Sequence, residues 1–338
     1  MRKFFNHLVF ILNSLIAFFT ICAYLLPFLK PSQFSVLSVL SLFLPDLMVV
    51  NVLFFIYWLV SFKRKMLLSL FVLLIGYPYL SSLFKLEFHD PVDTSDEVSI
   101  MSFNARLFNI YDWIRDDEIP KKIVDSIAKV SPDIVCIQEY YSGTDFDLPE
   151  YQYQYIHLTK QGSKVGQAIY SKYPIVNNGS IDFERTVNNA IFADIAIQKD
   201  TVRVYNLHLQ SLKITADMGD MSQSEAQNLV KRAGITFVQQ ERQMTKFLGH
   251  RNTSPFPVLI AADLNNTAHS YIYRRLTETV NDGFKEGGIG FGSTFVFRRF
   301  PLRIDFIFTD TGFQTLKQEV FHWKLSDHNP ILAHITLR

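Results

Sequence analysis

The segment "PVLIAADLN", Pro257–Asn265, decides how this chain of 338 residues is interpreted. A run of small and aliphatic residues, Val258–Ala262, leads directly into Asp263, and Asn265 follows two positions later. A continuous apolar run of this kind is typical of a strand that is buried on both faces. Because side chains alternate along an extended strand, Asp263 and Asn265 are predicted to point to the same side. A buried strand that ends in a carboxylate and an amide indicates a polar site at the edge of a sheet.

Further strand-like segments carry polar residues at one end. They place Asn104 in "SFN", Glu139 in "IQE", His208 in "NLH", Asp305 in "RID", and Asp327 and His328 in "SDHNP". Any one of these residues alone is more often a turn former, a helix cap or a satisfied core residue than a catalyst. As a set, the carboxylates and amides suit a hard divalent cation, and a histidine beside an aspartate can bind phosphate or move protons. We therefore predict one shared site, in which His208 pairs with Asp305 or Asp327.

The pattern of strands and helices predicts the fold class. Strand-like runs cover residues 98–105, 133–139, 166–175, 190–198, 202–211, 256–265, 302–310 and 330–337, and helical spacing covers residues 119–130 and 222–249. This mixture favours two layers of sheet covered by helices. The sequence lacks the cysteine and histidine spacing of a zinc site, a GxxxxGK loop and a GxSxG elbow.

The first part of the chain has the composition of a membrane region, and the mean hydropathy of the whole chain is +0.11. Three apolar segments, approximately Phe5–Phe28, Pro45–Phe62 and Met66–Phe84, approach the ~20 residues that a spanning helix needs. A cleavable signal peptide and the buried helices of a soluble protein are the alternatives, but the succession of three nearly uncharged segments favours membrane spans. The predicted parts are a transmembrane region over residues 1–88, a linker over residues 89–97 and a catalytic domain over residues 98–338.

Lysine and arginine positions predict the orientation in the membrane. Arg2 and Lys3 precede the first apolar segment and Lys63–Lys65 separate the second from the third, whereas Lys30 and Lys85 flank the opposite side. This excess places the N-terminus in the cytoplasm. We therefore expect a multi-pass protein of the inner or plasma membrane, with its catalytic domain in the periplasm or outside the cell.

Cysteine and charge content narrow the possibilities further. Cys22 lies in a predicted span and Cys136 in a predicted buried strand, so no disulfide is expected. Seven of the 33 basic and three of the 32 acidic residues lie in residues 1–90, which leaves the remainder with a net charge of about −3. The domain as a whole is therefore not a basic nucleic-acid-binding surface. Asp46, next to Pro45, is interpreted as a residue of a helix N-terminus.

These motifs resemble the endonuclease/exonuclease/phosphatase superfamily, which includes DNase I-like nucleases, sphingomyelinases and inositol-polyphosphate 5-phosphatases. The resemblance extends over about Glu97–Arg338 and suggests a membrane-anchored bacterial member. It rests on the ordered series "SFN", "IQE", "GQAIYSKYPI", "NLHL", "ADLN", "RIDFIF" and "SDHNP". No single motif is specific, but the ordered series is. Ala262 stands where the family usually has glycine, a small steric change that removes no functional group.

The resemblance implies an α/β fold, namely a four-layer α/β sandwich of the DNase I-like type, preceded here by an all-α transmembrane region of about three helices. It also implies phosphoester hydrolysis that depends on Mg²⁺ or Mn²⁺. Asp263 would orient or deprotonate the attacking water, Asn265 would hold the phosphate, and the histidines with their aspartates would contact phosphate oxygens. The implied residues are Asn104, Glu139 and Asp327 for the metal, and His208, Asp263, Asn265, Asp305, Asp327 and His328 for catalysis.

The function predicted from this resemblance is that of a membrane-anchored phosphodiesterase or endonuclease-like enzyme. Its expected partners are the lipid bilayer and a phosphoester substrate, either nucleic acid or a phospholipid head group; no protein partner is predicted. A lipid-head-group phosphodiesterase or phosphatase and a non-catalytic binding module are the alternatives. Four phenylalanines could line a substrate-facing loop, although core positions are favoured for them: Phe291, Phe295, Phe297 and Phe300. Asn266, Thr267 and His269 are interpreted as turn or helix-start residues.

Overall fold

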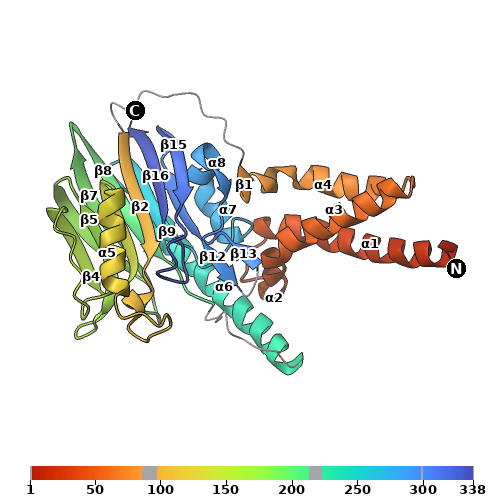
Figure 1. Ribbon diagram of the computed structural model, residues 1–338, viewed down its shortest axis with the longest axis horizontal. Coiled ribbons are helices and arrows are strands. Elements are labelled where there is room, and N and C mark those ends of the chain that lie inside the picture. The colour runs from red at the N-terminus through yellow and green to blue at the C-terminus, as the bar shows by residue number, and fades with distance from the viewer. Residues whose placement is uncertain (1, 86–96, 213–222, 298–299, 338) are drawn as a thin grey trace. The chain divides into compact units, whose positions relative to one another are not determined.

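The computed structural model describes residues 2–85, 97–212, 223–297 and 300–337 (Figure 1). The predicted linker lies outside these ranges except for Glu97, where a strand begins. The chain forms two compact units, which we call the helical unit and the sandwich unit. The helical unit comprises Met1–Ser82, Asp220–Glu241 and Asn266–Arg274, and the sandwich unit comprises Leu83–Gly219, Arg242–Asn265 and Arg275–Arg338. The units therefore differ from the predicted division near residue 90, because two later segments pack within the helical unit.

Two six-stranded sheets build the sandwich unit. The first has the strand order β15-β16-β2-β3-β5-β4, and the second has the order β10-β14-β9-β8-β7-β6. The first sheet consists of β2 (Glu97–Asn104), β3 (Ile134–Tyr141), β4 (Tyr153–Leu158), β5 (Val165–Ser171), β15 (Phe313–Val320) and β16 (Ile331–Leu337). The second consists of β6 (Ile175–Asp182), β7 (Asn189–Ile197), β8 (Asp200–His208), β9 (Val258–Asp263), β10 (Asn281–Asp282) and β14 (Asp305–Thr309).

The inner faces of the two sheets meet in an apolar core, and helices cover the outer faces. Inward-facing residues such as Ile100 of β2 and Val204 of β8 are fully buried in this core. The helix α5 (Ile119–Val130) covers the first sheet (Figure 1) with Ile119, Ile123 and Ile127, whose spacing of four places them on one face. The end of α6 (Gln223–Arg251) packs against the second sheet through aromatic rings. The predicted α/β sandwich is confirmed.

Three edge strands, β4, β6 and β15, were not predicted from the sequence, apart from the first residue of β6. β4 and β15 form the two opposite edges of the first sheet, β6 forms one edge of the second, and all three carry several partly exposed side chains. Such half-buried segments lack the continuous apolar runs by which the central strands are identified. Cys136 is buried in β3 and Cys22 lies in the first helix, and both are free cysteines.

The helical unit contains three long apolar helices, α1 (Arg2–Leu25), α3 (Leu44–Val60) and α4 (Met66–Leu80). Two apolar helical stretches, Lys3–Phe28 and Ser35–Val60, are each 26 residues long and could cross a membrane by length and composition. The third predicted span, α4, has only 15 residues, so three spans remain a prediction. Pro45 and Asp46 lie in the first turn of α3, as expected.

Short elements complete the fold. They are η1 (Leu26–Phe28), α2 (Ser35–Ser38), η2 (Val39–Phe43), η3 (Arg106–Asn109), α7 (Tyr271–Thr277), α8 (Gly283–Gly287), β1 (Phe84–Lys85), β11 (Gly290–Phe291), β12 (Phe295–Phe297) and β13 (Phe300–Leu302).

Candidate functional site

Strand register places three predicted site residues in one row across the second sheet. The strands β8 and β9 run parallel, with His208 opposite Asp263. On the other side of β9, the antiparallel β14 places Asp305 opposite Asp263. Asp305 therefore begins its strand whereas Asp263 ends its own, although both lie at the same edge of the sheet. The side chains of Asp263 and Asp305 are buried.

The first sheet contributes Asn104 and Glu139 to the same edge. Asn104 is the last residue of β2, and Glu139 lies in a β-bulge of β3, between Ile137 and Tyr140. The bulge gives Glu139 a left-handed φ of 50°, and it inserts one extra residue into the alternation of β3. Ile137 and Tyr140 consequently face the same side of β3, where they belong to the apolar cluster that includes the isoleucines of α5. The side chain of Glu139 therefore does not follow the alternation of the strand, and it lies at the site.

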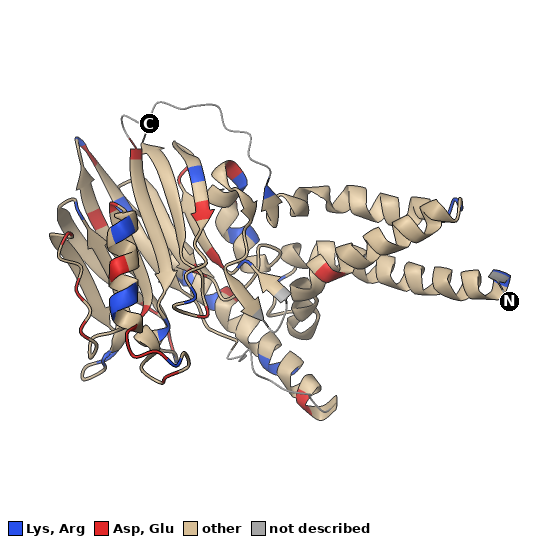
Figure 2. Ribbon diagram, in the orientation of Figure 1, with Lys and Arg blue, Asp and Glu red and all other residues tan. Residues whose placement is uncertain are grey.

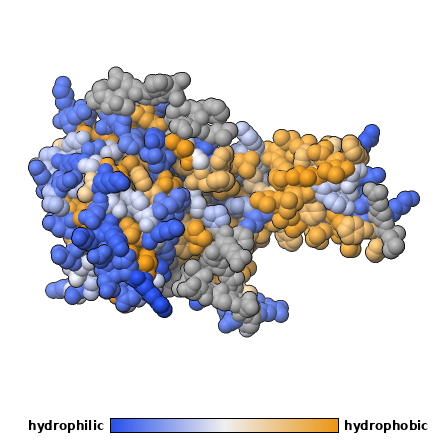
Figure 3. Space-filling model, viewed as in Figure 1, coloured by the Kyte–Doolittle hydropathy of each residue, from blue (hydrophilic) through white to orange (hydrophobic). Residues whose placement is uncertain are grey.

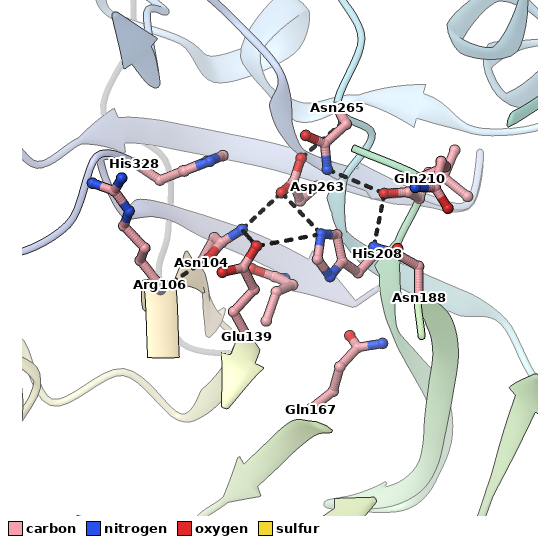
Figure 4. Close-up of polar contacts among 12 residues, drawn as sticks. Asn104, Arg106, Glu139, Gln167, Asn188, His208, Gln210, Asp263, Asn265 and His328 are labelled. Carbon is pink, nitrogen blue, oxygen red and sulfur yellow. Dashed lines mark hydrogen bonds and ion pairs between the residues drawn. The ribbon is translucent and has the colours of Figure 1, made fainter. Parts of the chain in front are cut away.

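Direct contacts join the residues of the two sheets (Figure 4). The amide Nδ2 of Asn104 donates hydrogen bonds to Asp263 Oδ2 at 2.9 Å and to Glu139 Oε1 at 3.3 Å. His208 Nε2 lies 3.6 Å from Asp263 Oδ2 and 3.9 Å from Glu139 Oε1. Four predicted residues that are distant in the sequence therefore lie within contact of one another.

His328 forms a second pair, with Asp305. The ring atom Nδ1 of His328 lies 3.0 and 3.1 Å from the two carboxylate oxygens of Asp305. Burial would lower the pKa of His328, but the negative charges of Asp305 and Asp263 outweigh it and raise the pKa to about 10. The imidazole is therefore positively charged at neutral pH. The predicted pairing of His208 with Asp305 or Asp327 is wrong, because register places His208 beside Asp263 and leaves Asp305 to His328.

The surroundings of Asp263 make its carboxylate more basic than that of an ordinary aspartate. Its burial, followed by the negative charge of Asp305, raises the pKa of the Asp263 carboxyl, whereas His328 and His208 act in the opposite direction. Its Oδ1 accepts the backbone N–H of Asn265 at 2.8 Å, and its Oδ2 accepts from Asn104. These bonds fix the plane of the carboxylate.

Asn265 reaches the site by a turn, and the strand does not continue to it. The strand β9 ends at Asp263, and Asn265 has a left-handed φ of 48°. The bond from its N–H to the Asp263 side chain is an Asx turn, which asparagine and aspartate favour. Its Nδ2 donates to the carbonyl oxygen of Leu209 at 3.1 Å. The two side chains are thus neighbours, but the alternation predicted for an extended chain is not the reason.

Asp327 is held by an arginine that the sequence did not single out. Arg106 Nε lies 3.3 Å from Asp327 Oδ2, and the guanidinium stacks over the ring of Trp113 at 4.2 Å. Arg106 begins four consecutive residues with φ between 45° and 64°, ending at Asn109. A left-handed turn costs ~1–2 kcal/mol per residue outside glycine, so this conformation marks a constrained segment. The position of Arg106, two residues after Asn104, was the available signal.

Other polar residues missed from the sequence surround His208 in the same view. Figure 4 shows Gln167, Asn188 and Gln210 beside the predicted residues. Asn188 Nδ2 donates to the carbonyl oxygen of Leu209 at 3.1 Å. Each follows or precedes a strand by one or two residues or lies within one, a pattern too common to have identified them.

The donor set fits a hard divalent cation at Glu139 and Asn104. Glu139 is about one-third exposed (31%), so a cation can reach its oxygens from solvent, and carboxylate and amide oxygens are the ligands that Mg²⁺ prefers. Among the described residues, Asp263, Asp305 and His328 also offer ligand atoms within 4.8 Å of one another. This buried group is a second candidate for the cation, which would have to displace the proton of His328. Asp327, the third predicted ligand, is bound to Arg106.

The remaining predictions concern the loops. The ring of Phe295 lies 5.0 Å from that of His328, so this phenylalanine borders the site. Phe291 is exposed, and its ring lies 4.8 Å from that of Phe84 in a tilted arrangement. The side chains of Phe297 and Phe300 lie outside the described part. In the helical unit, His269 is fully buried and its ring lies 5.6 Å from that of Tyr79, as befits a packing residue.

Comparisons with known proteins identify the family and the fold. A family model described as "Endonuclease/Exonuclease/phosphatase family" matches residues 101–328, and another, described as "Domain of unknown function", matches residues 6–83. No curated protein matches the chain. The solved structures similar to this chain include D. rerio TDP2 complexed with single-strand DNA product, at TM-score 0.55 and 15% identity, covering 72% of this chain and 100% of that one.

Two further solved structures have the same fold. The human Nocturnin catalytic domain with bound sulfate has a TM-score of 0.53 and 14% identity, covering 72% of this chain and 94% of that one. An endonuclease/exonuclease/phosphatase from Beutenbergia cavernae DSM 12333 has a TM-score of 0.53 and 16% identity, covering 72% of each chain. At these identities the likeness shows a shared fold.

Proposed function

The chain belongs to the endonuclease/exonuclease/phosphatase family, and from this we propose that it is a membrane-anchored, divalent-metal-dependent phosphoester hydrolase of the phosphodiesterase or endonuclease type. The observation that supports this most directly is the contact of Asn104 with both Asp263 and Glu139, together with His208 beside the two carboxylates. Every residue type that the chemistry needs is present and assembled. The loss of Glu139, Asp263 or His328 would mark a non-catalytic binding module, and all three are present.

The cation that the family implies would be held by Glu139 and Asn104, with Mg²⁺ or Mn²⁺ as the candidates. When bound, it would neutralise charge on a phosphoryl oxygen. Asp263 is the proposed general base, because burial has made its carboxylate more basic and its two hydrogen bonds orient it. It would accept the proton of the attacking water.

Positive and polar groups would bind the phosphate as its charge grows. The protonated ring of His328, held at Nδ1 by Asp305, presents its other N–H to the site as a charged donor. His208 and the amide of Asn265 are the donors proposed for the remaining oxygens. Donors fixed before the reaction stabilise the transition state without reorganising. Asp327 would keep Arg106 in place beside them.

The proposed membrane anchor rests on the inverted polarity of the helical unit. In the described part of its helices α1, α3 and α4, four polar residues are fully buried, namely Asn13, Thr20, Asn51 and Ser69, and the surface of these helices is mostly apolar (Figure 3). Asn13 of α1 bonds to Ser69 of α4 and to the indole of Trp58 of α3, at 2.8 and 3.0 Å. Only 28% of the most apolar window of each long stretch is buried, whereas the core helix of a soluble protein would be mostly buried. Polar contacts inside and apolar side chains outside are typical of helices in a bilayer.

The ends of this bundle suggest its orientation. Figure 2 shows lysine and arginine gathered at the N-terminus and at the connection between α3 and α4. Lys65, in that connection, donates to the backbone oxygen of Asn6 of α1, so both basic segments lie at the same end. By the positive-inside rule this end is cytoplasmic. We therefore expect a periplasmic alkaline-phosphatase reporter fused after Arg338 to be active in bacterial cells, and an inactive fusion would contradict the orientation.

Substrate choice remains between two phosphodiesters, nucleic acid and the head group of a phospholipid. The net charge of the C-terminal part disfavours tight binding of a duplex. The apolar bundle favours the second candidate, a lipid-head-group phosphodiesterase or phosphatase, because it would keep the enzyme beside its substrate. Both candidates use the same site.

The activity is best tested on the full chain in nanodiscs, because two segments of the C-terminal part pack within the helical unit. Plasmid DNA, RNA, sphingomyelin, phosphoinositides and bis-p-nitrophenyl phosphate should be offered with Mg²⁺ or Mn²⁺ and, in parallel, with excess EDTA. We expect hydrolysis of at least one substrate, and at least ~100-fold less with EDTA, because the cation supplies several kcal/mol of transition-state stabilisation. Hydrolysis of none of them would refute the proposed function.

A further inference from the structure

The interior between the two sheets changes character in layers toward the site. Along β2 and β8, the inward-facing positions step from Ile100 and Val204 in the apolar core to Ser102 and Asn206, and then to the site residues Asn104 and His208. The intermediate layer carries side-chain amides from both sheets. We call these residues the amide layer: Gln138 and Gln167 of the first sheet, and Asn189 and Asn206 of the second, all at most 3% exposed.

Asn206 ties its own sheet to two strands of the other one. Its Oδ1 accepts a hydrogen bond from Gln138 Nε2 at 2.7 Å. Its Nδ2 donates to the carbonyl oxygens of Ile137 in β3 and Ala168 in β5, at 2.9 and 3.1 Å. Gln138 Nε2 also donates to Ser102 Oγ at 3.0 Å. One buried side chain of the second sheet therefore makes three hydrogen bonds across the sandwich.

Gln167 makes a second link beside the first. Its Nε2 donates to the backbone oxygen and to the Oδ1 of Asn189, at 2.8 and 2.6 Å. The side chain points from β5 toward the site residues (Figure 4). The amide layer thus joins β3 and β5 to β7 and β8 just below the residues that are proposed to react.

The layer also holds the bulge that carries Glu139. The carbonyl of Ile137 stands where the register of β3 breaks, and Asn206 binds it there. Gln138, the next residue, is anchored to Asn206 as well. Gln138, which precedes Glu139, is therefore fixed to the opposite sheet. Its partner there, Asn206, precedes His208 by two positions.

Stability alone does not account for these amides. In the part of the chain that the structure describes, Gln138 Oε1, Gln167 Oε1 and Asn189 Nδ2 are buried and have no hydrogen-bond partner. Each such group costs free energy that an apolar residue would not cost. An apolar layer would also allow the sheets to settle at the spacing set by their own side chains. The amides instead join the two sheets by hydrogen bonds of fixed length.

We propose that the amide layer is a positioning layer, with Asn206 as its principal residue: it sets the distance between the two sheets so that Glu139 and Asn104 of one meet His208 and Asp263 of the other at bonding distance. The proposal rests on the proposed function of the same site. It assigns no chemical step to the amides, which act through the residues they hold.

The test compares Asn206→Leu with Val204→Ala in the full chain, in nanodiscs. Leucine has the branched shape of asparagine but is larger, and it removes all three bonds across the sandwich. Val204→Ala is the matched control: it lies on the same strand one layer deeper and leaves a cavity without touching the amides. The measurements are kcat and KM for bis-p-nitrophenyl phosphate, the Kd of Mn²⁺ by calorimetry, and the Tm without metal.

We expect Asn206→Leu to lower kcat about 100-fold, since a misplacement of ~1 Å costs that much. The Kd of Mn²⁺ should rise at least ~10-fold, as supporting residues of metal ligands typically contribute, while KM changes far less than kcat. Val204→Ala should lower the Tm and leave kcat and the Kd of Mn²⁺ near wild type. Gln167→Met is a milder second variant, should the first fail to fold, with an expected loss of about tenfold in kcat.

Values of kcat and Kd within about twofold of wild type in the variants that fold would overturn the proposal. Losses that follow the Tm, as large in Val204→Ala as in Asn206→Leu, would overturn it too, since they would reflect general destabilisation. If wild type hydrolyses no phosphoester, the proposed function fails, but the Kd of Mn²⁺ still decides whether the layer positions the site. A wild type that binds no Mn²⁺ overturns both.

Discussion

Replacing Asp263 by asparagine should lower kcat for phosphodiester hydrolysis about a thousandfold or more, equivalent to ~4 kcal/mol of barrier. The change keeps the size of the side chain and the acceptor for the N–H of Asn265, but it removes the proposed base and turns an NH₂ group toward Asn104. Because the folded state raises the pKa of Asp263, its ionised form destabilises that state above the ordinary pKa of an aspartate. Removing this charge offsets part of the ~1–3 kcal/mol that the two facing NH₂ groups cost. The Tm near neutral pH should therefore change little.

Asp194→Asn is the matched control for this prediction. Asp194 is a buried carboxylate of the same sheet, but it forms a two-point ion pair with Arg203, at 2.6 and 2.8 Å. Its loss leaves a buried arginine uncompensated and should cost ~3–5 kcal/mol of stability, with kcat per folded molecule unchanged. Activity of Asp263→Asn within tenfold of wild type, measured at saturating substrate and metal, would exclude Asp263 as the base.

Glu139→Gln should weaken Mn²⁺ binding about 100-fold and lower kcat/KM about a thousandfold at micromolar metal. Glutamine keeps the length of the side chain and can still accept from Asn104, but it removes the negative charge that draws the cation. The loss should be smaller at millimolar Mn²⁺, because excess metal refills a weakened site. Calorimetric titration and steady-state rates over a range of metal concentrations measure both effects.

An exposed glutamate, Glu184, supplies the control. Glu184→Gln changes the net charge by the same amount and should leave the Kd of Mn²⁺ and kcat/KM unaltered. The two variants together separate a ligand from a general electrostatic effect. Equal metal affinity in wild type and Glu139→Gln would show that the cation binds elsewhere, with the buried group of Asp263, Asp305 and His328 as the next candidate.

Central strands were predictable because their physics is local. β9 and β3 are apolar runs, buried on both sides, and each carries a polar residue where the apolar run ends. The edge strands β4, β6 and β15 escaped prediction because many of their side chains are partly or fully exposed, so pairing with a neighbour, and not their own pattern, makes them strands. Likewise the first helix of the core, α5, was predicted to the residue from its spacing of isoleucines.

The sequence by itself determined the family, the α/β class and the identity of the residues that meet at the site. These depend only on residue types and on their order along the chain, and both can be read without knowing any distance. Only the tertiary structure decided which histidine contacts which aspartate. The register of β8, β9 and β14 places His208 beside Asp263 and leaves Asp305 in contact with His328. This register depends on hydrogen bonds between segments that are far apart in the chain. The bulge at Glu139, the turn to Asn265 and the amide layer also depend on the tertiary structure. Each is held by hydrogen bonds to a segment far away in the sequence, so no single segment encodes it.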